Sequence, residues 1–263
     1  MDLGIKNKVA LVTAASQGLG KASAIELANE GVKLAICSRD QDKINQTAEE
    51  IQNLTGGEVL AVKADLDSTD DIENLIKEIE NKFNTVDILV NNTGGPKAGF
   101  FDDLSDEDWL KTFESTFLSA VRVTRKVLPF MKKNKWGRII NISSVSAKQP
   151  IDNLMLSNGV RMSIHGWAKT LSNQVASENI LINNVCPGFT HTERVDGLIK
   201  TQVENSNSSR EEIIESIASD IPAKRVGQAN ELAALVVFLS SEKASYITGQ
   251  SIAVDGGISS LPI

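Results

Sequence analysis

The chain has 263 residues, of which 41% are hydrophobic and 23% are charged, a composition typical of a globular protein with a large core. Its formal net charge of −7 argues against nucleic acid or an anionic membrane surface as the main partner. No apolar run approaches the roughly 20 residues that span a bilayer, and the first residues do not resemble a signal peptide. We therefore expect a cytoplasmic protein without membrane or nucleic-acid partners.

Short apolar runs alternate with longer amphipathic segments along the chain. In chain order they predict strand 8–13, helix 18–30, strand 32–37, helix 41–54, strand 58–63, helix 69–83, strand 86–91, helix 106–133, strand 138–142, a helix over about 153–177, strand 180–186 and strand 251–254. Short apolar strands that alternate with helices indicate a parallel sheet covered on both faces. Right-handed crossovers then predict an α/β fold with one doubly wound sheet of about seven strands, as a single domain over residues 1–263.

Two further features belong to this organisation. Pro129 is expected to kink the long helix near its end. The two cysteines, Cys37 and Cys186, each end a predicted strand and lack the spacing of a metal site. We interpret them as small core residues in a reducing compartment and expect no metal site.

The alternation breaks once, over residues 190–220. This segment is polar, carries mixed helical stretches, and is rich in serine and asparagine around residues 205–209. Irregular segments of this length in a compact domain are usually lids or binding elements, although a merely solvated insertion would look the same. We expect an inserted substrate lid here.

A glycine-containing loop follows the first predicted strand. It reads Thr13-Ala14-Ala15-Ser16-Gln17-Gly18-Leu19-Gly20. Glycines between a strand and a helix let the backbone turn tightly and approach a pyrophosphate, which then lies on the free N–H groups of the helix N-terminus. The loop therefore predicts a dinucleotide site.

This loop closely resembles the cofactor loop of the short-chain dehydrogenase/reductases, except that Ala14 stands where that family usually has its first glycine. The segments Asn91-Asn92-Thr93-Gly94, Asn141-Ile142-Ser143-Ser144 and Pro187-Gly188 continue the resemblance in family order. The chain is similar over its whole length to β-ketoacyl-acyl-carrier-protein reductases and to glucose dehydrogenase-like members. The resemblance implies a Rossmann fold, and it implies cofactor contacts from Thr13, Ser16, Gln17, Gly18, Leu19, Gly20, Asp65, Leu66, Asn91, Gly94, Arg161, Pro187, Gly188, Thr190 and Thr192.

The end of the second strand bears on the choice of cofactor. Enzymes that prefer NAD place a carboxylate there for the ribose 2′-OH, and by register this position is Ser38. Ser38 cannot repel a phosphate, and Arg39 could clamp one, so we expect a preference for NADP(H). Asp40 keeps NAD(H) possible, although it could instead cap the following helix.

The catalytic residues depart from the family pattern. The resemblance implies a serine at Ser144, but its Tyr-x-x-x-Lys pair falls on Ser157 and Arg161, and its asparagine falls on Thr116. An alkanol hydroxyl is a far weaker acid than a phenol, whereas Arg161 stays charged and could bind ribose hydroxyls or a substrate carboxylate. Ser157 and Arg161 could also merely fill space on the helix. Other candidate proton donors are Lys97, Lys148, Asp152, His191 and Glu193.

These observations favour an NADP(H)-dependent oxidoreductase that transfers a hydride between nicotinamide and a carbonyl or alcohol, with an altered proton donor. One alternative is a dinucleotide-binding regulatory or sensor protein without turnover. Another is a lyase or isomerase that holds an anionic substrate through Arg161. The apolar faces of the helices at 106–133 and 153–177 predict a homotetramer or homodimer, with residues 258–263 packed on a neighbouring subunit.

Overall fold

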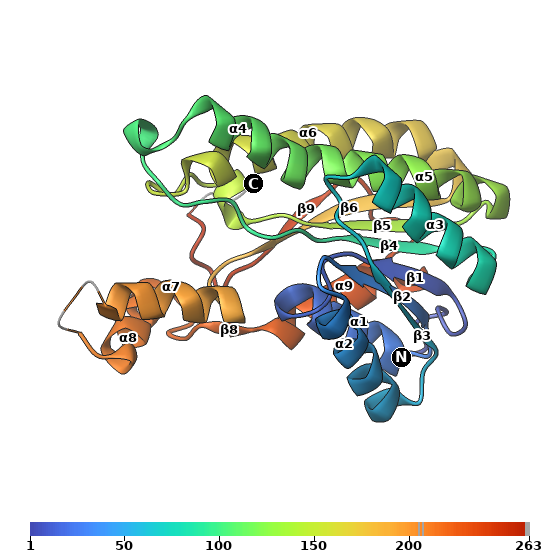
Figure 1. Cartoon of the computed structure of the whole chain (residues 1–263), viewed down its shortest axis with the longest axis horizontal. Helices are drawn as coiled ribbons and strands as arrows, with labels where there is room; N and C mark the ends of the chain where they lie inside the picture. The colour runs from blue at the N-terminus through green and yellow to red at the C-terminus, as the bar shows by residue number, and fades with distance from the viewer. Residues whose placement is uncertain (205, 207, 261–263) are drawn as a thin grey trace.

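A seven-stranded parallel sheet forms the centre of the computed structural model, which describes residues 1–204, 206 and 208–260 (Figure 1). The strands are β1 (Val9–Val12), β2 (Lys33–Ser38), β3 (Val59–Lys63), β4 (Ile88–Asn91), β5 (Gly137–Ile142), β6 (Ile180–Pro187) and β9 (Ser251–Val254). Their order across the sheet is β3-β2-β1-β4-β5-β6-β9. The predicted doubly wound α/β domain with seven strands is confirmed.

Helices cover both faces of this sheet (Figure 1). One face carries α1 (Gly18–Asn29), α2 (Gln41–Thr55) and α9 (Ala229–Leu239). The other carries α3 (Thr69–Phe83), α4 (Asp106–Thr112), α5 (Ser119–Asn134) and α6 (Met155–Val175). Because both faces are covered, the five inner strands bury nearly every side chain, and two separate apolar cores form on the two sides. Among the described residues, no helix is long and apolar enough to cross a membrane.

The prediction differs from the structure in two helical regions. The expected helix 106–133 contains a π-helical stretch, η2 (Phe113–Leu118), between α4 and α5. The second difference is α9, which was not predicted. Leu232, Ala233, Val236 and Val237 of α9 are all buried, and α9 packs against α1, so its sequence has no polar stripe to reveal the helical period.

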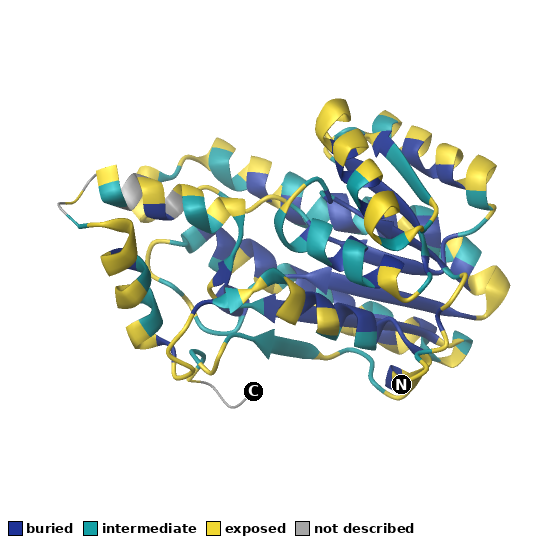
Figure 2. Cartoon of the chain, turned by 90° about the horizontal axis from the view of Figure 1, so that it is seen from below, coloured by how far each residue is buried: buried dark blue, intermediate teal, exposed yellow. Residues whose placement is uncertain are grey.

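The segment that interrupts the alternation forms a helical pair beside the sheet (Figure 1). Two short parallel strands, β7 (Thr190–His191) and β8 (Gly227–Gln228), join its two ends. Between them lie α7 (Glu193–Glu204) and α8 (Arg210–Asp220). Much of this pair is exposed (Figure 2). Residues 205 and 207 of the serine-rich stretch, and residues 261–263 of the predicted subunit contact, lie outside the described part of the chain.

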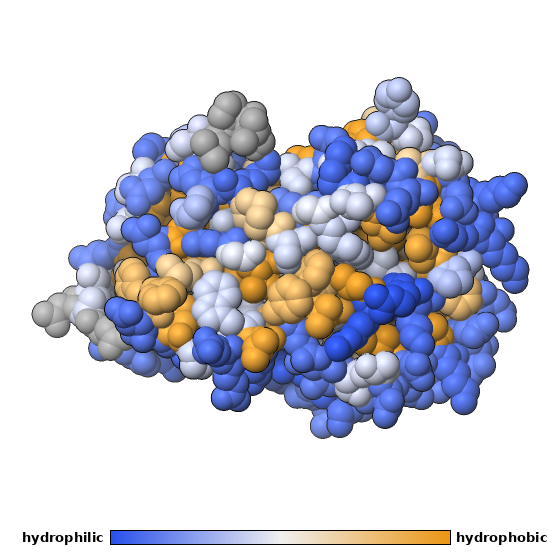
Figure 3. Space-filling view, turned by 90° about the horizontal axis from the view of Figure 1, so that it is seen from above, coloured by the Kyte–Doolittle hydropathy of each residue, from blue (hydrophilic) through white to orange (hydrophobic). Residues whose placement is uncertain are grey.

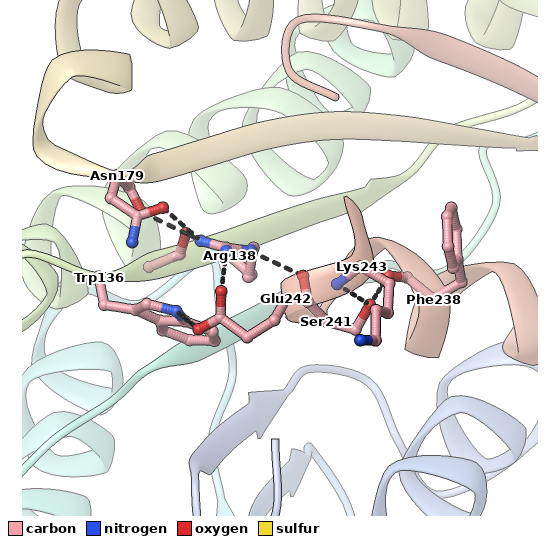
Figure 4. Close-up of polar contacts among 8 residues, drawn as sticks. Trp136, Arg138, Asn179, Phe238, Ser241, Glu242 and Lys243 are labelled. Carbon is pink, nitrogen blue, oxygen red and sulfur yellow. Dashed lines mark hydrogen bonds and ion pairs between the residues drawn. The ribbon is translucent and has the colours of Figure 1, made fainter. Parts of the chain in front are cut away.

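A buried arginine anchors the amino ends of the strands (Figure 4). Arg138 on β5 is 0% exposed and donates to the main-chain oxygens of Asn179 at 3.0 Å and Ser241 at 3.3 Å. Glu242 lies 3.6 Å from its Nη2 and also accepts from Trp136 Nε1 at 2.6 Å. The Arg138 guanidinium stacks over the Trp136 ring, 4.3 Å from the centroid. These contacts join β5, the start of β6 and the end of α9 at the edge opposite the functional residues.

At the other edge, His165 joins α6 to two strands. Its Nε2 lies 2.9 Å from Ser143 Oγ, just after β5, and 3.7 Å from the Sγ atom of Cys186 in β6. Burial, followed by the charges of Lys148 and Arg161, lowers the pKa of His165 to about 4. Both cysteines are buried, Cys37 within β2 and Cys186 within β6.

This depressed pKa predicts a loss of stability in mild acid. The unfolded chain protonates His165 near pH 6.5 and the folded chain only near pH 4, so the unfolded state binds more protons between these values. The free energy of unfolding should therefore fall as the pH drops below about 6.5, by at most ~1.4 kcal/mol per pH unit from this group. Urea unfolding between about pH 5 and 7.5 measures the slope.

The matched control uses the second histidine of the chain. His165→Gln keeps a hydrogen-bonding group beside Ser143 and should flatten the slope, whereas His191→Gln should retain it. Equal slopes in the wild type and His165→Gln would show that His165 does not titrate in this way.

Candidate active site

A cleft of about 890 Å³ opens at the carboxyl ends of the strands. Strand order reverses between β1 and β4, so the loops that follow these two strands diverge and leave a crevice. The cleft extends from the end of β2, past the loop after β1, to the start of α7. This volume lies within the range of clefts that bind small molecules and cofactors.

The predicted phosphate loop has the backbone that such a loop requires. Ala14 and Gly18 both have left-handed backbone, with φ of +46° and +57°, so Ala14 adopts a conformation that glycine takes at lower cost. A Cβ on Gly20 would lie 2.6 Å from the Ala14 oxygen and 2.7 Å from Asn92 Nδ2. Gly20 therefore permits close packing of the loop, while Gly18 faces the cleft.

Thr13 and Asn92 brace this loop against the neighbouring strand. Thr13 Oγ1 donates to the Asn92 oxygen at 2.7 Å and accepts from the Asn92 N–H at 2.8 Å. The Asn92 side chain donates in turn to the Ala14 oxygen at 3.1 Å. The two loops that form the walls of the crevice are thereby tied together at its floor.

The residues expected to discriminate between NADP(H) and NAD(H) lie in the cleft at the end of β2. Ser38 Oγ donates to the Asp40 oxygen at 2.9 Å, and the Asp40 carboxylate caps α2 by accepting from the Lys43 N–H at 3.1 Å. The alternative role of Asp40 as a helix cap is therefore confirmed. Arg39 is exposed and lines the cleft, and no hydrogen bond or ion pair engages it within the described residues.

A ladder of buried amides aligns the strand ends beneath the cleft. Asn91, Asn141, Asn184 and Ser251 are opposite one another in β4, β5, β6 and β9. Asn91 Nδ2 donates to Asn141 Oδ1, Asn141 Nδ2 to Asn184 Oδ1, and Asn184 Nδ2 to Ser251 Oγ, each at 2.9 Å. Asn91 thus lies below the cleft, as part of its support.

Three serines occupy the corner of the cleft after β5. Ser144 Oγ accepts a hydrogen bond from the Ser146 N–H at 3.0 Å, which leaves the Ser144 hydroxyl proton available to donate elsewhere. Ser157, buried on α6, lies 2.9 Å from the Ser146 hydroxyl. Ser144 and Ser157 both line the cleft, so the structure brings together the predicted serine and the residue at the predicted tyrosine position.

Arg161 lies one helical turn beyond Ser157 on the same face of α6. Its side chain is buried, and Nη1 donates to the oxygens of Ile142 at 3.1 Å and Ser143 at 2.9 Å. Burial and repulsion from Arg194 lower the pKa of Arg161 to about 10, so it remains a cation at neutral pH.

Most of the predicted site residues surround this one cleft. Those that line it are Ser16, Gln17, Gly18, Leu19, Ser38, Arg39, Asp65, Leu66, Gly94, Ser144, Ser157, Arg161, Pro187, Gly188, Thr190 and Thr192. Thr13, Gly20 and Asn91 lie beneath the lining instead. The cofactor contacts themselves stay predictions.

The candidate proton donors are more scattered. Only Glu193 of the five lines the cleft among the described residues, and Lys97 pairs with Asp108 at 3.0 Å.

Sequence reasoning missed Arg194 and Ser146, because neither belongs to a motif and their roles depend on contacts across the fold. Asn92 belongs to the segment Asn91-Asn92-Thr93-Gly94, and that segment is the sequence signal for its contact with Ala14. No group of three metal-binding side chains occurs within the described ranges.

Comparisons with known proteins give the family. Residues 13–259 match the family model described as "Enoyl-(Acyl carrier protein) reductase". NADPH-dependent reductase BacG of Bacillus subtilis is 35% identical over 96% of this chain and 98% of its own length. The 3-oxoacyl-[acyl-carrier-protein] reductase FabG of Aquifex aeolicus is 34% identical over 98% of this chain and 100% of its own length.

A solved structure agrees with this assignment. L-sorbose reductase from Gluconobacter frateurii, complexed with NADPH and L-sorbose, superposes with a TM-score of 0.96 at 31% identity. The match covers 99% of this chain and 100% of the other. The family model and these relatives show that the chain belongs to the short-chain dehydrogenase/reductase family, and the reversed strand order and the braced glycine loop agree with this.

Proposed function

We propose that this protein is an NADP(H)-dependent oxidoreductase that transfers a hydride between nicotinamide and a carbonyl or alcohol substrate. One observation carries the proposal: the available hydroxyl of Ser144 and the buried cation of Arg161 line the same cleft as the glycine loop. The reductase relatives support it, and they lend no support to the regulatory alternative.

The residues present fit a dinucleotide. The cleft holds about 890 Å³. Gly18, the first residue of α1, lines it without a side chain, so an anion can approach the free N–H groups of the helix N-terminus. Gly18 and Leu19 would hold the diphosphate, Asp65 and Leu66 the adenine, and Pro187, Gly188, Thr190 and Thr192 the nicotinamide end. When bound, the cofactor supplies the hydride.

Arg39 would select the phosphate of NADP(H). It is the cation at the end of β2, no hydrogen bond or ion pair engages it in the described chain, and the neighbouring Ser38 hydroxyl donates to the Asp40 oxygen. A guanidinium in this position can pair with a phosphate through charge-assisted hydrogen bonds.

Within the substrate half, Ser144 would polarise the carbonyl. Its oxygen accepts from the Ser146 N–H, so its own proton is available for a substrate oxygen. Arg161 would supply positive charge beside Ser144 for an anionic group of the substrate, because it keeps its proton at neutral pH. For the same reason it cannot act as the proton donor.

The proton donor of this reaction is altered in our proposal. Ser157 and Arg161 stand in place of the family's tyrosine and lysine, and the Ser157 hydroxyl is hydrogen-bonded to Ser146. A serine hydroxyl is a poor acid, so the alkoxide is neutralised by a proton that enters from solvent through the hydroxyls of Ser157 and Ser146. We further propose that residues 190–220 form the lid over this half of the cleft.

The first prediction of this proposal concerns the choice of cofactor. Ser38→Asp combined with Arg39→Gln adds a ribose acceptor and removes the phosphate cation, so NADPH affinity should fall at least ~10-fold while NADH affinity rises. Fluorescence titration of both cofactors measures the ratio. Wild-type protein that binds NADH more tightly than NADPH would contradict the proposal.

The second prediction of this proposal concerns turnover. Ser144→Ala removes the donor to the carbonyl, so kcat should fall ~10²-fold or more while NADPH affinity is retained. Ser157→Tyr with Arg161→Lys should lower turnover or leave it unchanged, because the altered arrangement is built around Arg161. Absorbance of NADPH over a panel of ketones, aldehydes and sugars measures both. A large gain from the double change would show instead that the wild type is a weakened enzyme of the usual kind.

The protein also assembles as a homodimer or homotetramer in our proposal. Large apolar side chains gather on the face formed by α4, α5 and α6, seen from above in Figure 3. Leu110 is 72% exposed and Met162 52% exposed beside a hollow lined by Trp109, Phe113 and Gly159. A face of this kind marks an interface between subunits.

This assembly predicts a response to charge on that face. Leu110→Glu should reduce the mass measured by light scattering to that of one chain, because a carboxylate cannot be buried unpaired. Leu54→Glu is the matched control, since Leu54 is 64% exposed on α2, on the other face of the sheet. A monomeric wild type at micromolar concentration would refute the assembly.

A further inference from the structure

Arg161 is a buried cation whose charge no carboxylate compensates. It is 7% exposed, and the hydrogen bonds that hold it come from Nη1 alone, to the oxygens of Ile142 and Ser143. Its Nε and Nη2 atoms have no hydrogen-bond partner within the described chain, and the residue lines the cleft. Neither atom is among the fully buried unpartnered atoms, so both are accessible from the cleft and can donate to an anion that enters it.

Arg194 brings a second guanidinium to the same part of the cleft. It stands near the start of α7 and reaches across to the loop after β4, where Nη2 donates to the Pro96 oxygen at 2.9 Å. The guanidinium lies against Gly95, whose missing side chain makes room for it, because a Cβ there would overlap Nη1. Arg194 also repels Arg161, which lowers the pKa of Arg161.

The two arginines differ from others in the molecule. Arg122, Arg138, Arg210 and Arg225 each have a carboxylate within 4 Å. Among the described arginines without one, Arg39 and Arg125 are exposed, whereas Arg161 is buried and Arg194 is held against the loop after β4. Glu193, an acidic residue of the cleft wall, is the chain neighbour of Arg194, and its Oε2 lies 3.5 Å from where a Cβ of Gly18 would be. Glu193 therefore faces the phosphate loop.

We propose that Arg161 and Arg194 together bind the carboxylate of the substrate, so the protein acts on keto acids. The inference rests on the proposed function and narrows its substrate class. Arg161 is fixed by the oxygen of Ser143, directly before Ser144, so a carboxylate held by Arg161 places the reacting carbonyl only a few bonds away. This spacing selects α-keto and β-keto acids.

The reaction balances without any further reactant. A hydride from NADPH adds to the carbonyl carbon, the C=O π pair becomes the lone pair of an alkoxide, and a proton from solvent converts it to the hydroxy acid. NADP⁺ is the oxidised product, and the carboxylate is unchanged and stays on the two guanidinium groups.

The test compares acids with their esters on the full-length protein. The probes are α-ketoisocaproate and acetoacetate, each beside its methyl ester, with NADPH. A charged hydrogen bond contributes about 1.5–3 kcal/mol, so wild-type kcat/KM should favour each acid over its ester by ~10-fold or more. Arg194→Gln should remove most of this preference by slowing the acids alone. Arg210→Gln, which breaks an exposed ion pair with Asp196 in the same helical pair, should not change it.

Gly95→Ala tests the geometry without touching a charge. A methyl group at this position displaces the Arg194 guanidinium, so the variant should lose the acid preference as Arg194→Gln does. Gly166→Ala is the control, because a Cβ there meets nothing within 4 Å and the position is exposed on α6. Circular dichroism establishes that each variant is folded.

Cofactor titration separates the two anions that Arg194 could meet. If Arg194 holds the substrate carboxylate, the NADPH dissociation constant of Arg194→Gln should stay within about 3-fold of the wild type. If it holds the cofactor diphosphate, NADPH binding weakens and acids and esters slow equally, which overturns the inference. Equal wild-type activity on acids and esters also overturns it.

Calorimetry keeps the anion site testable if nothing turns over. Acetoacetate titrated into NADP⁺-saturated protein should release heat that methyl acetoacetate does not, and Arg194→Gln should abolish the signal. Binding without turnover would refute the proposed oxidoreductase and leave the carboxylate site standing. Turnover of esters alone, with no acid binding, would refute the carboxylate site and leave the proposed oxidoreductase standing.

Discussion

The amide ladder of Asn91, Asn141 and Asn184 is the constraint on which the site depends. Neighbouring parallel strands are joined by slanted main-chain bonds that leave their ends free to fray, but these side chains join three consecutive strands at the edge that carries the cleft. Each amide of the ladder donates to the next, and Asn141 both accepts and donates. A buried polar chain of this kind is stabilising only when every member is satisfied, so it defines one register for the strands.

That register determines where the reactive groups lie. Ser143 and Ser144 leave the sheet directly after β5, Asn92 after β4, and Gly188 after β6. A shift of one residue in any strand would turn its side chains to the opposite face and remove its loop from the cleft. The buried Arg138 performs the corresponding task at the amino edge, with main-chain oxygens from the start of β6 and the end of α9. The sheet is thus held by polar side chains at both ends and by apolar packing between them.

The sequence was sufficient to predict the sheet and the residues around the cleft, because both follow from local patterns of residues. Apolar runs predict the strands, and the glycine loop predicts the crevice at the reversal of strand order. The sequence was insufficient to predict contacts between segments that are far apart in the chain. Arg194 reads as an exposed residue of a polar segment, and only the fold shows that its guanidinium lies on Gly95. Asn184 belonged to no quoted motif, and only the pairing of β5 with β6 places it beside Asn141. The buried helix α9 was missed because it lacks a polar face.

The burial of both cysteines has a practical consequence. Burial raises the pKa of Cys37 to about 12 and that of Cys186 to about 11, so neither is a thiolate at neutral pH. Thiol reagents attack the thiolate and need access to it, which both side chains lack. A single cysteine introduced at the exposed Ser216 of α8 would consequently be the one site in the chain that accepts a fluorescent dye. The helical pair can therefore be labelled at one position without altering any residue of the core.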